Sequence, residues 1–298
     1  MSRPDPATET FEAHRPRLAR LAYRMLGSFA EAEDVVQNAW LRWRAVNPAE
    51  VREPVAWLTR TTTRLALDVL KSARARRETY VGAWLPEPLV EPQPDPCGDD
   101  LTLTLMVALE RLSPLERAAF LLHDVFGIGF DEVARTLDRD SASVRQLASR
   151  ARRHVRDARP RYAVEREEGD RIARAFFEAS RSGDIAALGD LLAETAILRA
   201  DGGGKVIAFH NPIYGARKLL RLFASLSRKY GPGAFEYIRP LWIDGLPGYA
   251  SLERGDILQT TALAIEDGRI VAIFITRNPD KLAHMKTLLG SGPSILPC

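Results

Sequence analysis

The sequence predicts a multidomain chain in which two all-α modules precede a domain of α+β type. Three observations predict this class. Apolar residues recur at helical spacing over most of the first 160 residues. Five prolines between residues 86 and 96 interrupt that pattern and favour an extended connection. Beyond residue 165, helical stretches give way to short apolar runs separated by glycine turns, which are typical of strands.

Composition sets the outer limits. The 298 residues include 46% hydrophobic side chains, enough for real cores, and carry a net charge of +3. Arginines crowd residues 15–77 and 145–161, so nucleic acid is a plausible partner of particular faces. Two cysteines form neither a metal cluster nor a disulfide framework, and no metal or cofactor is expected. No apolar leader or membrane-length run is found, so we expect a cytoplasmic protein without membrane contact.

Three helices are expected in the first module. The first covers residues 11–26 and ends at Gly27, and the second begins with the capping-box pattern Ser28-x-x-Glu31. An acidic cluster in its first turn suits the helix dipole, and could equally form a docking surface. Pro54 opens the third helix, which extends to residue 77 with a basic polar side.

Residues 80–100 read as a linker between domains. Their proline content denies helix, yet the stretch Trp84-Leu85-Pro86-Glu87-Pro88 is too apolar for a free spacer. We therefore expect Trp84 and Leu85 to dock on a neighbouring domain.

The second module ends in two short helices around a tight turn, residues 130–155. Ser113-Pro114-Leu115-Glu116 starts a helix before them, which Gly127 ends. Asp140 and Ser141 interrupt the later pattern with capping side chains. The second short helix places apolar residues on one face and a basic set on the other, which could grip phosphates and read base edges. The alternative is an ordinary helical hairpin with a solvated basic face.

The last part reads as helices followed by a curved antiparallel sheet. Helices are expected at 171–182, 184–192, 216–230 and 280–289. A β-hairpin is expected from residues 197–200 and 205–209 around the glycine turn 201–204. Further strands are expected at 235–243, 249–252, 257–265 and 270–276, with tight turns at Asp244-Gly245 and Asp267-Gly268.

Several separated motifs make residues 10–160 similar to bacterial RNA polymerase sigma factors of the extracytoplasmic-function (ECF) group. The stretch 30–37, AEAEDVVQ, resembles the region 2 helix that docks on core polymerase. Residues 54–58, PVAWL, and 68–71, DVLK, resemble the segment that opens and reads the −10 element, and the loop before them resembles the pocket for a flipped base. Residues 112–117 and the two short helices resemble region 4, which reads the −35 element. Most members have asparagine at the position of Arg64.

The resemblance implies three sets of contacts. It implies core polymerase contacts at Glu33, Asp34 and Gln37. It implies contacts in the −10 region at Asn47, Arg52, Trp57, Arg60, Arg64 and Lys71. It implies −35 contacts to bases or the groove at Arg145, Gln146, Ser149 and Arg150, and to phosphates at Arg152 and Arg153.

The last part resembles the SnoaL-like branch of the NTF2 fold, a cone of curved sheet wrapped by helices. The resemblance implies a built-in regulator, and it rests on three short motifs. Their residues are Trp84, Leu85 and Pro86 of WLPEP; Asp201, Gly202, Gly203, Gly204 and Lys205; and Asn278, Pro279, Asp280, Lys281 and Leu282. We assign residues 8–78 to region 2, 79–100 to the linker, 101–161 to region 4 and 167–290 to the regulatory domain.

SnoaL relatives include cyclases and isomerases, so catalysis must be weighed. Asp201, His210, Tyr214, Asp244 and Asp256 could be recruited, but Asp201 and Asp244 have a plainer reading as turn residues and His210 as the end of a strand. Two other interpretations of this domain remain. It could bind an unidentified small molecule without turnover, or it could serve interdomain control alone. The fold alone does not decide between them.

The resulting interpretation is a promoter-specificity subunit of RNA polymerase, a non-enzymatic monomer when free, with core polymerase and promoter DNA as partners. The alternatives are a DNA-binding regulator fused to a small-molecule-binding or isomerase-like enzyme domain, and a repressor or activator that binds DNA without polymerase.

Overall fold

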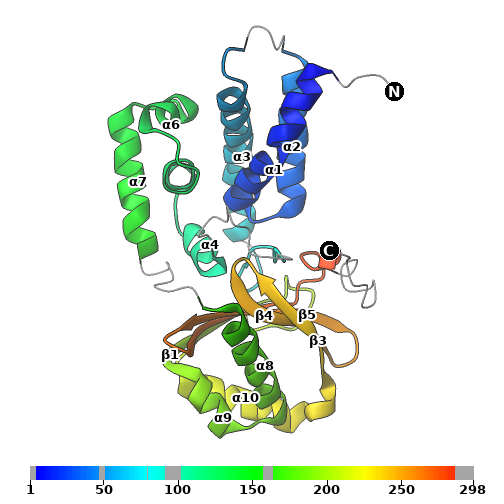
Figure 1. The fold of residues 1–298 in the computed structure, drawn as a ribbon. Helices are drawn as coiled ribbons and strands as arrows, with labels where there is room; N and C mark the ends of the chain where they lie inside the picture. The colour runs from blue at the N-terminus through cyan, green and yellow to red at the C-terminus, as the bar shows by residue number, and fades with distance from the viewer. Residues whose placement is uncertain (1–4, 47–50, 79, 91–101, 157–163, 286–298) are drawn as a thin grey trace. The chain divides into compact units, whose positions relative to one another are not determined.

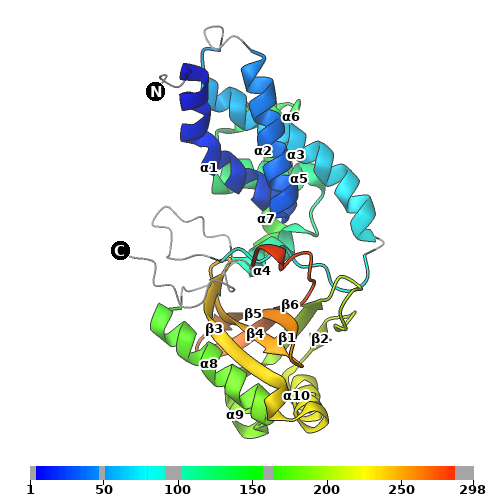
Figure 2. The same cartoon turned by 90° about the vertical axis from the view of Figure 1, so that its right-hand side faces the viewer.

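The computed structural model describes residues 5–46, 51–78, 80–90, 102–156 and 164–285. The chain forms two compact units, drawn in Figures 1 and 2. The first comprises residues 1–79 and 105–158, and the second comprises residues 80–104 and 159–298. The described part of the proline-rich segment, residues 80–90, therefore belongs to the same unit as the C-terminal domain. We call residues 80–90 the linker segment.

The first unit contains two groups of helices. The first group is α1 (Pro6–Leu26), α2 (Phe29–Arg44) and α3 (Pro54–Glu78). The second group is α4 (Leu103–Leu109, which begins in the other unit), α5 (Pro114–Phe120), α6 (Phe130–Leu137) and α7 (Ser141–Val155). The predicted helix starts at Ser28 and Ser113 are confirmed, and Ser113 and Glu116 form the full capping box. The helix after Ser113 continues beyond α5 as a π-helical turn, Leu121–Val125.

One arginine ties these groups together inside the first unit. Arg117 of α5 is buried and donates from Nε and Nη2 to the backbone oxygen of Arg24, at 3.3 and 3.0 Å. That oxygen lies in the last turn of α1, where helix carbonyls lack intrahelical partners. Nη1 of Arg117 pairs with Glu110. The Arg117 guanidinium thus caps the C-terminal end of α1 and joins it to α5.

The second unit is built on one six-stranded sheet. Its strands are β1 (Leu192–Asp201), β2 (Ile213–Tyr214), β3 (Phe235–Ile243), β4 (Leu246–Glu253), β5 (Ile257–Glu266) and β6 (Arg269–Thr276). Their order in the sheet is β2-β1-β6-β5-β4-β3. The tight turns at Asp244-Gly245 and Asp267-Gly268 are confirmed, with positive φ at all four residues.

Two expectations for this sheet are wrong. β1 pairs with β6 in parallel, so the sheet is mixed. Residues 205–209 form no strand, and the antiparallel partner of β1 is instead β2. The glycine turn explains the second difference, because the N–H groups of Lys205 and Val206 both bind the oxygen of Gly202. This tight helical turn directs the chain away from a hairpin.

Helices α8 (Arg166–Ser182), α9 (Ile185–Leu191) and α10 (Ala216–Tyr230) cover one face of the sheet (Figure 2). Their buried residues, among them Phe176, Leu188 and Phe223, share one core with β1, β4, β5 and β6. The expected helix at 280–289 is helical at residues 283–285, and its remainder from 286 lies outside the described residues. Within the described ranges, no helix has the length and apolar character needed to cross a membrane.

We expect Arg117→Ala to destabilise the first unit. The substitution removes the Arg117 guanidinium from Glu110, whose side chain is only 18% exposed, and from the backbone oxygen of Arg24. Removing one partner of a buried pair costs about 3 kcal/mol or more. Hydrogen exchange of the α1 and α5 amides in the full chain measures this loss. Arg111→Ala, at an exposed position, is the matched control, and equal protection in both variants would contradict the assigned role.

Candidate functional site

The basic helix α7 presents the side chains that the sequence predicts for DNA. Asp140 caps the helix, since its carboxylate accepts from the backbone N–H of Ser143 at 2.7 Å and from its hydroxyl at 2.6 Å. These bonds hold the pKa of Asp140 below its usual range. Val144, Ala148, Ala151 and Val155 are buried. All six predicted −35 residues are exposed on the other side: Arg145, Gln146, Ser149, Arg150, Arg152 and Arg153.

Two of these arginines also have partners within the unit. The Arg145 guanidinium lies over the ring of Phe130, 5.4 Å from its centroid. Arg152 Nε lies 2.7 Å from Asp124 Oδ1, on the π-helical turn. The sequence pattern missed the Asp124 partner because it lies 28 positions away.

The residues predicted for the −10 region lie on and just before α3. Arg52 and Lys71 are exposed, Arg60 is half-buried, and Asn47 lies outside the described residues. Trp57 packs against Trp43 of α2, with ring centroids 5.4 Å apart, so part of it serves the core.

Arg64 of α3 has a role that the sequence did not predict. Its Nε donates to the backbone oxygen of Thr136 at 3.0 Å, and its Nη2 donates to that of Arg135 at 3.1 Å. Both carbonyls lie in the last turn of α6, the first helix of the helix-turn-helix. Arg64 therefore joins the predicted −10 and −35 modules within the first unit.

The three residues predicted to contact core polymerase share the exposed side of α2. Glu33, Asp34 and Gln37 are exposed, while Val35 and Val36 between them are buried. Glu33 pairs with Arg15 of α1 at 2.8 Å, with both side chains about half exposed. Such an exposed pair is weak, so the acidic surface remains free to exchange partners.

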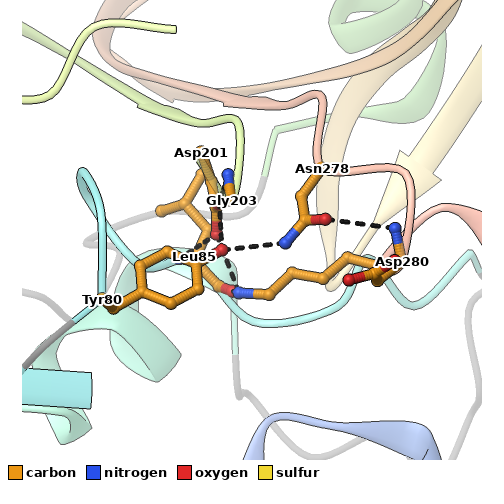
Figure 3. Close-up of polar contacts among 7 residues, drawn as sticks. Tyr80, Leu85, Asp201, Gly203, Asn278 and Asp280 are labelled. Atoms are coloured by element: carbon orange, nitrogen blue, oxygen red, sulfur yellow. Dashed lines mark hydrogen bonds and ion pairs between the residues drawn. The ribbon is translucent and has the colours of Figure 1, made fainter. Parts of the chain in front are cut away.

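The second unit gathers the three short motifs around one buried carboxylate, as Figure 3 shows. Asp201, at the end of β1, is fully buried. Its Oδ1 accepts from the Tyr80 hydroxyl at 2.5 Å and from the Gly203 N–H at 3.0 Å. Its Oδ2 accepts from the Leu85 N–H at 2.9 Å and from Lys281 Nζ at 2.7 Å. The reading of Asp201 as a plain turn residue is therefore incomplete, because its side chain binds the linker segment.

Lys281 and Asn278 complete this cluster. Lys281, 7% exposed, also donates to the Leu85 oxygen and lies 4.1 Å from the centre of the Trp84 ring. Asn278 Nδ2 donates to the Tyr80 hydroxyl at 2.9 Å. Burial, and next the hydrogen bond to Asp201, raise the pKa of Tyr80, so the phenol stays a donor. We call Tyr80, Leu85, Asp201, Asn278 and Lys281 the linker lock.

The other motif residues support the linker lock. A Cβ on Gly203, which has φ +63°, would lie 2.3 Å from Asn278 Nδ2. A Cβ on Gly202 would lie 2.1 Å from the Val206 oxygen. Gly204 is likewise left-handed, at φ +70°. Only glycine permits this close approach of turn and lock.

The remaining motif residues lie around this turn. Lys205 pairs with Asp280 at 2.6 Å. Pro86 and Leu282 are buried, and Pro279 is half-buried.

A second set of contacts holds the far end of the linker segment. Leu89 N–H donates to Asp244 Oδ2 at 3.1 Å, and Asp244 N–H donates back to the Leu89 oxygen at 2.8 Å. Val90 bridges Ile243 of the edge strand β3, and His284 Nε2 lies 3.0 Å from the Pro88 oxygen. The linker segment thus runs from the end of β1 to the end of β3.

The five candidate catalytic residues are not brought together. Asp201 and Asp244 are buried and bind the linker segment at separate places. His210, Tyr214 and Asp256 are exposed. A cavity of about 280 Å³ lies between the sheet and its helices, and none of the five lines it. Across the described ranges, no group of three His, Cys, Asp or Glu side chains is arranged to hold a metal ion.

Comparisons with known proteins agree with this layout. The description Sigma-70 region 2 matches residues 10–76, and Sigma-70, region 4 matches residues 102–155. The chain is 38% identical over 290 residues to the ECF RNA polymerase sigma factor SigJ of Mycobacterium tuberculosis, with 91% of each chain covered. It is 32% identical over 300 residues to the probable ECF RNA polymerase sigma factor SigI of that species, covering 98% of this chain and 100% of the relative.

Solved structures extend the likeness to both units. The crystal structure of Mycobacterium tuberculosis SigJ aligns with 93% of this chain and 98% of its own, at 34% identity and a TM-score of 0.75. A SnoaL-like protein of Burkholderia thailandensis aligns with 38% of this chain and 97% of its own, at 12% identity and a TM-score of 0.33. The predicted fold class, helical regions 2 and 4 followed by an α+β domain, is confirmed. The chain belongs to the extracytoplasmic-function family of RNA polymerase sigma factors.

Proposed function

We propose that this sigma factor, whose family binds core RNA polymerase and promoter DNA, is restrained by its own C-terminal domain through the linker lock. The observation that carries the proposal is the burial of Asp201 with both Lys281 and the linker segment on its carboxylate. The linker segment joins α3 of region 2 to α4 of region 4 along the chain. A domain that holds this segment controls how far the two DNA-binding regions can separate.

The separation of the two promoter elements explains why holding the linker segment would matter. The −10 and −35 elements lie roughly 25 base pairs apart, which is about 85 Å of duplex at 3.4 Å per base pair. In the free chain, Arg64 of region 2 is hydrogen-bonded to α6 of region 4. Both elements cannot be engaged while that contact persists. Initiation therefore requires the two regions to part, and a linker segment held at both ends opposes it.

We assign the individual contacts as follows. Arg145, Gln146, Ser149 and Arg150 read the −35 element, and Arg152 and Arg153 bind phosphates once Arg152 leaves Asp124. Residues of the −10 contact are Asn47, Arg52, Trp57, Arg60, Arg64 and Lys71. Glu33, Asp34 and Gln37 form the core polymerase contact, and their exposure on one side of α2 supports this assignment.

The C-terminal domain acts here as a regulator and not as an enzyme. The separation of its five candidate catalytic residues supports this reading over a fused isomerase or cyclase, because acid–base catalysis needs its groups within reach of one substrate. We propose that a small molecule bound in the cavity serves as the signal that controls this regulator. We propose that the free protein is a monomer in the cytoplasm, where the chromosome and polymerase lie.

We expect Asp201→Asn to raise transcription from a cognate promoter at least tenfold with core polymerase in vitro. The substitution removes the Asp201 carboxylate charge from the buried Lys281 ammonium, which costs about 3 kcal/mol or more, and each 1.4 kcal/mol changes a population tenfold. Trp84→Ala, which removes the ring beside Lys281, should act in the same direction.

Asp190→Asn, at an exposed position of α9, is the matched control for charge loss in the same domain. Thermal unfolding of each variant separates release of the linker segment from loss of the domain. Unchanged or reduced transcription from folded Asp201→Asn protein would contradict the proposed restraint.

We expect Arg150→Ala to weaken holoenzyme binding to promoters that carry the −35 element by about 5- to 150-fold, the range for a good base contact of about 1–3 kcal/mol. Discrimination against mutated −35 sequences should fall with it, because a base contact carries specificity. Arg171→Ala, which removes a 71% exposed arginine of α8, is the control. A uniform loss on all sequences would make Arg150 a phosphate contact instead.

A further inference from the structure

The cavity of the C-terminal domain has an apolar body. Aromatic rings from α8, α10, β3 and β4 line it: Phe176, Phe177, Phe223, Phe235 and Tyr249. Phe177 contacts Tyr249 edge-on at a centroid distance of 5.3 Å, and Phe176 meets Phe223 in the same way at 5.4 Å. These contacts fix the rings, so the cavity is a formed space suited to a flat hydrocarbon group.

One part of the wall carries a largely buried charge pair. Arg277 Nη2 lies 2.9 Å from Glu253 Oε2, and the two side chains are only 12% and 15% exposed. Burial raises the pKa of Glu253 and lowers that of Arg277. Among the described residues, Nε and Nη2 of Arg277 find no acceptor of suitable hydrogen-bond geometry. A buried guanidinium with unused N–H groups is costly, and a second oxyanion beside it would recover that cost.

The charges around the cavity favour an anion. Four cationic side chains line it, against the single carboxylate of Glu253. They are Arg181, Lys229, Arg254 and Arg277. Arg181 is also paired with Glu178 at 2.8 Å, outside the lining, which leaves the other three facing one acid. The lining therefore carries a net positive charge beside an aromatic pocket.

The charged wall is joined directly to the linker lock by the backbone. Arg277 precedes Asn278, and Ala200, which also lines the cavity, precedes Asp201. The backbone oxygen of Asp201 accepts hydrogen bonds from the backbone N–H groups of Arg277 at 2.7 Å and Asn278 at 3.0 Å. A shift of the Arg277 backbone therefore moves two members of the lock.

We propose that this cavity binds an amphipathic organic anion, an aromatic carboxylate with its ring among the phenylalanines and its carboxylate at Arg277. Binding draws the Arg277 backbone toward the ligand and loosens the linker lock. This second part rests on the proposed restraint of the sigma regions, whereas the binding itself does not.

The binding test uses 2-naphthoate and its neutral analogue 2-naphthamide, titrated into the full chain by calorimetry. We expect the acid to bind at least tenfold more tightly than the amide. The double variant Glu253→Gln/Arg277→Met, which removes the buried pair together, should abolish this preference while amide binding persists. Leu226→Trp, which fills the cavity from α10, should abolish both, and Arg217→Met, on the exposed side of α10, should change neither.

The coupling test follows hydrogen exchange of the Leu85 and Leu89 amides and transcription with core polymerase, with and without saturating 2-naphthoate. We expect at least tenfold faster exchange at Leu85 and a rise in transcription. Absent binding, or equal binding of acid and amide, overturns the ligand class even if Asp201→Asn still activates. Preferential binding with unchanged Leu85 exchange overturns the coupling. An unresponsive Asp201→Asn variant, with ligand binding intact, rejects the proposed restraint instead.

Discussion

The second unit depends on one buried carboxylate. Asp201 has no access to water, and its charge is tolerable only because four donors surround it. Two of these donors belong to the linker segment, 121 and 116 positions earlier in the chain, and one belongs to Lys281, 80 positions later. Releasing the linker segment therefore removes two of the four donors from a buried carboxylate and leaves it with Lys281 and the Gly203 N–H. For this reason the segment that joins regions 2 and 4 behaves as part of the C-terminal domain.

The first unit uses arginine in a comparable way. Arg64 and Arg117 each bind carbonyl oxygens in the last turn of a helix from the other group, where such oxygens lack intrahelical partners. The Arg64 N–H groups that hold α6 cannot bind promoter DNA at the same time. Under the −10 contact that we propose for Arg64, contact between the regions and contact with DNA are competing uses of one side chain.

Local signals were readable in the sequence, and most long-range partners were not, although the docking of Trp84 and Leu85 on another domain was expected. The caps at Ser113 and Asp140, the two Asp-Gly turns and the exposed face of α7 follow from residues within four positions of each other. The false hairpin at 205–209 arose because the glycine turn closes on the Gly202 oxygen, and the parallel pairing of β1 with β6 was missed because these strands lie far apart in the chain. The motifs around Trp84, Asp201 and Lys281 were recognised, but spacing alone could not show that one carboxylate joins them. The sequence marked Arg64 only as a departure from the usual asparagine, and its hydrogen bonds to α6 could not be predicted from that.

The energies involved leave room for control. Turning a population from 1:99 to 99:1 needs about 5.5 kcal/mol of differential binding. A ligand that prefers one state a thousandfold supplies about 4 kcal/mol, so it shifts the balance without completing it. Core polymerase, with a larger interface, can supply the remainder. Because the cavity wall at Arg277 and the linker lock at Asn278 are adjacent residues, both contributions would act on the same few hydrogen bonds. Under the proposed restraint, contacts within the chain itself would make the opening of this sigma factor conditional.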